Sequence, residues 1–110
     1  MLRVTTLLVL TNLPDQSAAR SLAERLVEAR LAACVNILAP CRSVYRWQGK
    51  VETADEVPLL IKTSAARLAE LTAAIRASHP YELPEVVALD IAAGLPEYLA
   101  WLAAETAPST

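Results

Sequence analysis

The chain contains little of several residue types that particular functions require. Its 110 residues include two glycines, one histidine, one methionine and no phenylalanine. Two glycines cannot build the glycine-rich loop that cradles phosphates in P-loop proteins. One histidine excludes the two-histidine HExxH metal motif, and no Ser-His-Asp set with a nucleophile elbow is present. The common nucleotide-binding, metalloprotease and hydrolase motifs are therefore excluded.

Charge and hydropathy exclude two further classes of partner. Twelve acidic and ten basic residues give a net charge of −2, and the basic residues are scattered among glutamates. Without a basic stripe, no nucleic acid partner is expected. Hydrophobic residues make up 55% of the chain, but no run approaches the about 18–20 apolar residues that a membrane helix needs. We expect a cytoplasmic protein, not bound to a membrane, with a single domain over residues 1–110.

Cys34 and Cys41 are the only candidates for a disulfide. On one regular strand they would lie about 23 Å apart on opposite faces, whereas a disulfide needs Cα atoms within about 7 Å. We interpret both as free thiols, consistent with a reducing compartment. Cys34 is either a small core hydrophobe or a soft-metal ligand, and the latter needs an imidazole such as that of His79 nearby.

Apolar periodicity and turn signals predict alternating strands and helices along the chain. Val27 belongs to the apolar stripe of the first helix, and Pro58 predicts an edge or a bulge in the strand that contains it. The expected order is a strand over 2–11, a helix capped by Asp15, a long strand over 32–48 interrupted at Ala39-Pro40, a tight turn at Gln48-Gly49, a strand over 50–63, a helix capped by Thr63-Ser64, a strand over 86–91 and a last helix from Gly94 and Pro96.

This order, βαββαβ followed by a C-terminal helix, predicts an α+β fold with a ferredoxin-like antiparallel sheet. The two main helices would cover one face of that sheet. The first two strands are apolar on both sides, and one short C-terminal helix is too small to cover the other face. Because monomers avoid large exposed apolar patches, we expect an oligomer.

Residues 79–85 are the most informative part of the chain for function. They hold the only histidine, His79, with two prolines, Tyr81, Glu82 and Glu85. The prolines stiffen the backbone between them. The segment is either a ligand-binding element or a rigid connector with a polar surface histidine, and residue types leave both open. Acid–base chemistry by His79 is conceivable, but no nucleophile or substrate is identified.

Three further side chains are candidates for an interface or a binding site. Tyr45 and Trp47 share one face near the tip of the predicted hairpin, where aromatic residues mediate subunit packing or stack on a ligand. Lys62 lies in an otherwise apolar strand, Leu59-Leu60-Ile61-Lys62-Thr63. It either pairs with a carboxylate or anionic ligand or reaches water at the strand end.

Several longer motifs follow one another over about residues 4–105. They are Ala32-Ala33-Cys34-Val35-Asn36-Ile37, Ser43-Val44-Tyr45-Arg46-Trp47 through Glu52, Leu60-Ile61-Lys62-Thr63, His79-Pro80-Tyr81 with Pro84-Glu85, and Tyr98-Leu99-Ala100-Trp101. Together they resemble the CutA family of divalent-cation tolerance proteins.

The resemblance implies a cytoplasmic homotrimer of ferredoxin-like subunits, similar in shape to the PII signalling proteins. In that family the long hairpin strands pair between neighbouring subunits. The family is linked to tolerance of copper and other divalent metals, and no enzymatic reaction is established for it. Matching motif positions place Trp47, Lys62, His79, Tyr81 and Glu82 in the cleft between subunits.

The resemblance also bears on metal binding. Some members carry a cysteine at the end of the first strand and a histidine pair before the motif proline, positions associated with copper. Here those positions hold Thr11 and Ser78, and His79 alone is retained, with Cys34 as the remaining soft ligand. We therefore expect weak binding of copper(II) or another divalent metal at His79, with Glu82 or water completing the coordination.

Three functions from different classes fit these observations. The leading one is a non-enzymatic trimer that binds a divalent metal or a small anion at clefts between subunits, with no obligatory cofactor. The second is a PII-like signalling module that binds a small anionic metabolite and a protein partner. The third is a small enzyme that uses His79 and Glu82 for acid–base chemistry.

Overall fold

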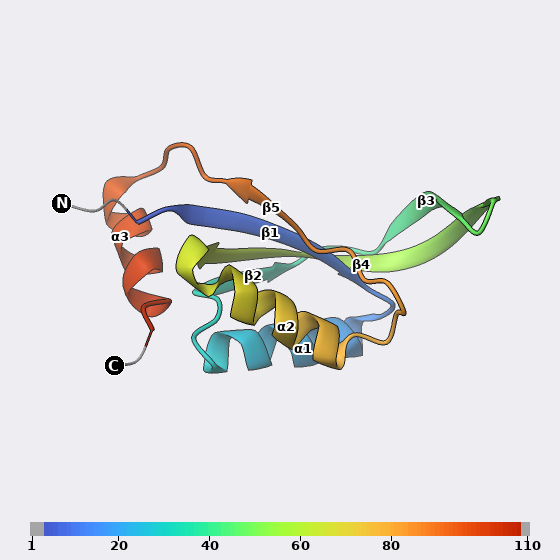
Figure 1. Ribbon diagram of the computed structural model, residues 1–110, viewed down its shortest axis with the longest axis horizontal. Helices are drawn as coiled ribbons and strands as arrows, with labels where there is room; N and C mark the ends of the chain where they lie inside the picture. Colours follow the sequence, from blue (N-terminus) through green and yellow to red (C-terminus); the bar gives the residue numbers. More distant parts are fainter. Residues whose placement is uncertain (1–3, 109–110) are drawn as a thin grey trace.

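The structure, a computed structural model, describes residues 4–108. Strands and helices alternate in the order expected from the sequence (Figure 1). Their bounds are β1 Thr6–Leu13, α1 Gln16–Glu28, β2 Cys34–Ile37, β3 Cys41–Trp47, β4 Lys50–Ser64, the short 3-10 helix η1 Ala65–Arg67, α2 Leu68–Ser78, β5 Val87–Asp90 and α3 Pro96–Glu105.

Strand β4 is the centre of an antiparallel sheet. Strand β1 lies along one side of it, from Thr6 opposite Ser64 to Leu13 opposite Val57. Strands β2 and β3 follow one another along the other side, and β5 pairs with the outer edge of β1. The spatial order is β2-β4-β1-β5. The predictions of an antiparallel sheet, a central first strand and a long hairpin are thus confirmed.

The predicted interruption at Ala39-Pro40 is confirmed as a bulge. Ile37 lies opposite Leu59 and Cys41 lies opposite Glu56, so three residues between β2 and β3 face two residues of β4. One extra residue on one side of an antiparallel pair is the definition of a β-bulge.

The prediction that Pro58 would lie at an edge or a bulge is confirmed for the bulge, although the extra residue is on the opposite strand. Strand β4 continues through Pro58, which lies opposite Asn12 of β1. The Pro58 carbonyl accepts a hydrogen bond from the amide of Leu38, 3.0 Å away. Because a strand residue directs its nitrogen to the same side as its carbonyl, the missing proton of Pro58 faces the bulged segment. Proline is tolerated there because the ladder is already interrupted.

The predicted tight turn at Gln48-Gly49 is confirmed. Both residues have positive φ, 50° for Gln48 and 79° for Gly49. Two successive positive φ values are typical of the type I′ turn that joins two antiparallel strands with the correct twist. The turn closes the hairpin of β3 and β4, which extends beyond the helices (Figure 1).

Helix α1 begins at the predicted cap, but fewer residues of its apolar stripe are buried than the sequence predicted. Oδ1 of Asp15 accepts a hydrogen bond from the amide of Ala18, 2.8 Å away, which satisfies one free N–H of the first turn. Four residues of the stripe are buried, but Val27 is 43% exposed. Val27 lies at the edge of the stripe, next to charged residues that face water.

The predicted helix cap at Thr63-Ser64 is wrong. A 3-10 turn over Ala65–Arg67 precedes α2, and Ser64 makes no side-chain cap bond. Both hydroxyls bond elsewhere. The Thr63 hydroxyl donates to the carbonyl of Leu31 at 2.7 Å, and the Ser64 hydroxyl lies 3.0 Å from that of Thr106. Tertiary partners have replaced the local cap.

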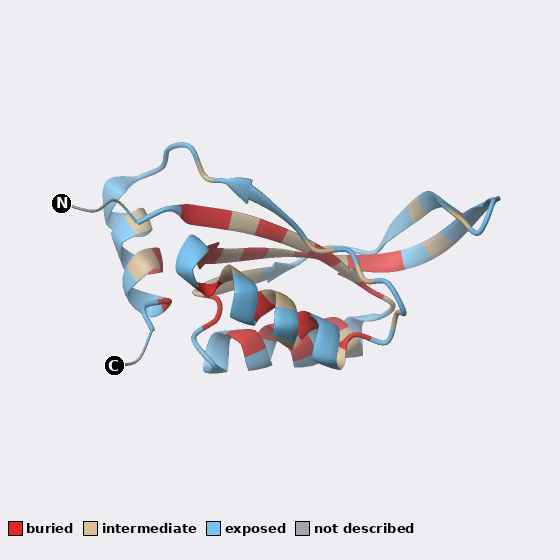
Figure 2. Cartoon of the chain, in the orientation of Figure 1, coloured by how far each residue is buried: buried red, intermediate tan, exposed pale blue. Residues whose placement is uncertain are grey.

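Helices α1 and α2 cover one face of the sheet, and α3 lies across its end (Figure 1). The buried core lies between the sheet and α1 and α2, and buried residues alternate along β1 and β4 (Figure 2). The opposite residues of the central strands are apolar as well, and no helix within residues 4–108 covers their middle. This uncovered face comprises Leu8, Leu10, Leu60, Val87 and Leu89, of which Val87 and Leu89 are 47% and 52% exposed.

Helix α3 starts at Pro96. Proline is favoured at the first position of a helix because the backbone N–H that it lacks would have no partner there. No helix within residues 4–108 is long and apolar enough to cross a membrane. Cys34 and Cys41 are free thiols, as their spacing predicted. Leu2, assigned to the first strand from the sequence, lies outside the described residues.

Candidate functional site

His79 is buried at the end of α2 and is held by two hydrogen bonds. Its Nε2 donates to the backbone carbonyl of Asn12 at 2.7 Å, and its Nδ1 accepts from the amide of Tyr81 at 3.2 Å. A carbonyl can only accept, so the proton is on Nε2 and the ring is neutral in this arrangement. Pro80 favours the extended backbone seen at His79. A metal ion could bind either ring nitrogen only after that hydrogen bond is replaced.

Tyr81 joins the histidine to a buried carboxylate. Its ring centroid lies 4.7 Å from that of His79. Burial, with the neighbouring Glu56 carboxylate, raises the pKa of Tyr81 to about 12. The structure therefore brings together two of the predicted side chains, His79 and Tyr81, and Tyr45 on β3 is near enough to contribute to the same shift.

Glu56 is a member of this cluster that the sequence interpretation missed. It is only 8% exposed, and it begins the apolar half of β4. Its even-numbered position places it on the same side of the strand as Pro58, Leu60 and Lys62. A carboxylate at the start of an apolar alternating run is the signal that could have identified it.

The two glutamates of the 79–85 segment have different environments. Oε1 of Glu85 accepts a hydrogen bond from the side-chain amide of Asn12 at 3.1 Å, which ties this segment to the end of β1 a second time. Glu82 is exposed. The hydrogen bonds of His79 go to Asn12 and Tyr81 rather than to Glu82, so the pair proposed for acid–base chemistry is not assembled here.

Lys62 is the centre of a second cluster, at the other end of the uncovered face. Its Nζ donates to Oδ1 of Asn36 on β2 and lies 4.0 Å from Sγ of Cys34. Burial raises the pKa of Tyr98 on α3, and the nearby Cys34 thiol raises it further. The cluster therefore joins β2, β4 and α3.

The two clusters are distinct within one subunit. Glu56 and Lys62 are six residues apart on β4, which corresponds to about 20 Å along a strand. Trp47 is half-buried near the hairpin tip, opposite Lys50 and on the same face as Tyr45, as predicted. Within residues 4–108, no three His, Cys, Asp or Glu side chains are grouped to hold a metal ion. Cys34 and His79 belong to different clusters.

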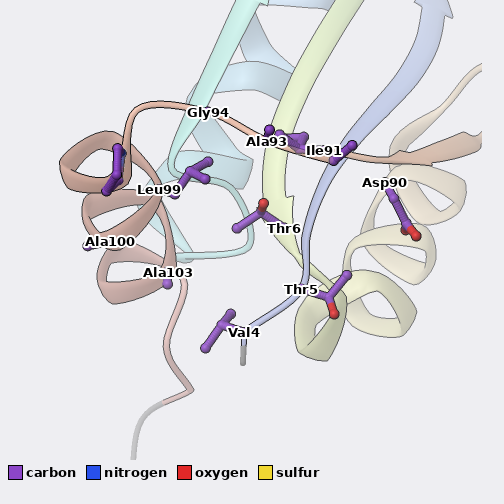
Figure 3. Close-up of a pocket in the computed structure, with 12 residues that line it drawn as sticks. Val4, Thr5, Thr6, Asp90, Ile91, Ala93, Gly94, Leu99, Ala100 and Ala103 are labelled. Atoms are coloured by element: carbon purple, nitrogen blue, oxygen red, sulfur yellow. The ribbon is translucent and has the colours of Figure 1, made fainter. Parts of the chain in front are cut away.

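A groove of about 630 Å³ lies between the start of β1, the loop after β5 and α3 (Figure 3). Its walls are mostly small apolar side chains, with Thr5, Thr6 and Asp90 as polar groups. Gly94 borders it beside Leu99, and a Cβ at that position would lie 3.2 Å from the Leu99 side chain. None of the side chains predicted to bind a ligand lines this groove.

Residues 7–105 match the family model described as CutA1 divalent ion tolerance protein. A curated relative, "Divalent-cation tolerance protein CutA" of Thermus thermophilus, is 49% identical over 98 residues, which cover 89% of this chain and 95% of the relative. "Protein CutA, chloroplastic" of Arabidopsis thaliana is 43% identical, and the match covers 90% of this chain but 54% of that relative. The crystal structure of CutA1 from Oryza sativa superimposes with a TM-score of 0.92 at 42% identity, over 96% of this chain and 97% of that one.

Proposed function

We propose that this chain, which belongs to the CutA1 divalent ion tolerance protein family, works as a homotrimer. The trimer binds a divalent metal or a small ligand at the clefts between its subunits. It catalyses no reaction. The observation that carries the proposal is the uncovered apolar face of the sheet. Leu8, Leu10 and Leu60 are half-buried there, beside exposed Val87 and Leu89. Contiguous apolar surface of this kind marks an interface in a protein of this size.

Two open strand edges also support assembly. Within the described residues, β5 pairs only with β1, and β3 pairs only with β4. Unpaired edges invite pairing with another chain. A hairpin strand of one subunit on the edge of another, repeated head to tail, closes a ring, as the family resemblance implies. The strand order β2-β4-β1-β5, with β2 and β3 as one bulged strand, supports the ferredoxin-like assignment within this proposal.

Metal binding is the part of the proposal that follows from the names of the relatives. The Thermus thermophilus relative is named for divalent-cation tolerance. Imidazole suits copper(II), so His79 is the ligand that we propose, with weak affinity because a hydrogen bond must be replaced. Catalysis is not part of the proposal because both nitrogens of His79 are engaged and Glu82 is exposed. Two free thiols are consistent with a cytoplasmic location.

A small anion is the second candidate ligand, and Lys62 is the observation that favours it. Among residues 4–108 the ion pairs are Arg42–Asp55 and Arg67–Glu70, and Lys62 takes part in neither. A half-buried ammonium without a carboxylate partner is suited to an anionic ligand. This interpretation corresponds to the PII-like alternative.

A pair of charge substitutions tests whether the uncovered face mediates assembly. Leu89→Asp places a carboxylate on this face, and Val27→Asp places one at a similarly exposed position on α1. Sedimentation should show that Leu89→Asp lowers the mass of the assembly and that Val27→Asp leaves it unchanged. An equal mass for both variants and the native chain would contradict the proposal.

A further inference from the structure

Lys62 is a half-buried cation, and among residues 4–108 neither of its hydrogen-bond partners is a carboxylate. Its ammonium group has three protons. The neighbours that the structure gives it are the amide oxygen of Asn36 and the thiol of Cys34. Neither ion pair of the described residues includes it. At least one proton of the ammonium group is therefore left for another acceptor.

Further hydrogen-bond donors lie at the same place. Because Oδ1 of Asn36 accepts from Lys62, the two N–H groups of the Asn36 amide point away from the ammonium and can donate elsewhere. Tyr98 is 40% exposed, and its hydroxyl lies near Cys34, one of the groups that raise its pKa. An ammonium, an amide and a phenol thus come together from β4, β2 and α3, and none of them is used by the cluster around His79.

The surroundings of these donors are apolar. Lys62 lies opposite Leu8 on β1, and Asn36 lies opposite Leu60 on β4. Directly paired residues of antiparallel strands have neighbouring side chains on one face. Both leucines are half-buried. Leu8 and Leu60 belong to the face that a neighbouring copy is proposed to cover, so the carbon atoms of a ligand at Lys62 would lie beside these leucines at the margin of that face.

We infer that this cluster binds the carboxylate of a small organic acid with a short apolar part. Lysine presents a single point charge, which suits a monocarboxylate flanked by neutral donors. A phosphate group would be better served by backbone amides at a glycine-rich loop, or by arginine. The site lies at the margin of the uncovered face, so the inference rests on the proposed function and specifies the small ligand that it leaves open.

Calorimetric titration with sodium butyrate, at constant ionic strength, tests the inference. Butyramide has the same carbon chain without the charge and serves as the control ligand. We expect saturable binding of butyrate and none of butyramide. Lys62→Met keeps an apolar stem and should weaken butyrate binding by about 10- to 100-fold, as expected for loss of a charge-assisted hydrogen bond. Lys62→Arg should retain most of the affinity, and Tyr98→Phe should lose a smaller part.

Light scattering on each variant separates this inference from the proposed assembly. Equal butyrate affinities for the native chain and Lys62→Met, or no binding by a native trimer, would overturn the inference and leave the trimer standing. Loss of trimer mass in Lys62→Met but not in Lys62→Arg would also overturn it, because a carboxylate of a neighbouring copy would then be the partner of Lys62. A native monomer that binds butyrate through Lys62 would support the site and overturn the trimer.

Discussion

The imidazole of His79 donates a 2.7 Å hydrogen bond to the backbone carbonyl of Asn12, 67 residues earlier in the chain. The bond fixes the segment between α2 and β5 against the end of β1. It also fixes the tautomer of the ring, whose other nitrogen accepts from the amide of Tyr81. The one histidine of this chain therefore has a structural task that any metal ion has to compete with.

Copper(II) binding at His79 should be weak. Calorimetry at pH 7.5 should detect binding by the native chain and less binding by His79→Ala. Acidification should lower the affinity, because only the neutral imidazole is a ligand. Equal binding by the two proteins would remove His79 as a ligand and point to Cys34 or to surface carboxylates. Circular dichroism controls for folding, since the substitution also leaves the Asn12 carbonyl without its donor.

Alkaline pH should destabilise the protein through Tyr81. Its pKa is raised from 10.0 to about 12 in the folded chain, so the folded state holds a proton that the unfolded state loses first. The stabilisation is complete below pH 10 and is lost as the pH rises toward 12. Absorbance of tyrosinate should show a late-titrating group that disappears in Tyr81→Phe. Glu56→Gln should make Tyr81 titrate earlier, and an unchanged profile would show that Glu56 does not contribute to the shift.

Much of the fold could be predicted because its signals are local. The carboxylate of Asp15, the turn at Gln48-Gly49 and Pro96 each act within a few residues, and all are found where expected. The prediction of a helix cap at Ser64 was wrong because the Ser64 hydroxyl lies next to that of Thr106, a partner 42 residues away. Pro58 lies at a bulge, as its residue type predicts, but the sequence did not indicate that the extra residue is on the opposite strand.

The residue types of the candidate site could be predicted from the sequence, but which of these side chains lie close together could not. His79, Tyr81 and Lys62 stood out as unusual side chains in stiff or apolar segments. Which of them meet depends on how β4 spans the sheet, and this places Lys62 about 20 Å from Glu56. Single-sequence periodicity carries no information on such distances, so Asn12 and Glu56 were missed.

The end of α3 should depend on the hydroxyl of Thr106. This residue is fully buried, and its hydroxyl lies 2.9 Å from the Leu102 carbonyl and 3.0 Å from the Ser64 hydroxyl. Thr106→Val should lower the free energy of unfolding by about 1–3 kcal/mol, because Ser64 is left unsatisfied. Thr53→Val, at an exposed position of β4, should change it little. Denaturant unfolding measures both, and equal effects would contradict the assigned role.

Trp47 should stabilise the assembly rather than the subunit. It is half-buried near the tip of a hairpin that extends from the body. Trp47→Ala should weaken subunit association by about 2–4 kcal/mol, measured by sedimentation at several concentrations. Arg46→Ala, on the opposite face of the hairpin, is the matched control and should have a smaller effect. A Trp47→Ala protein that keeps its mass and melting temperature would identify Trp47 as a ligand contact instead.

The uncovered face of the sheet makes assembly the central claim. Light scattering of the native protein at micromolar concentration measures the mass of the assembly directly. We predict three times the 11.9 kDa of one chain, with a melting temperature that rises with protein concentration. A stable species at the mass of one chain, with concentration-independent melting, would contradict the account.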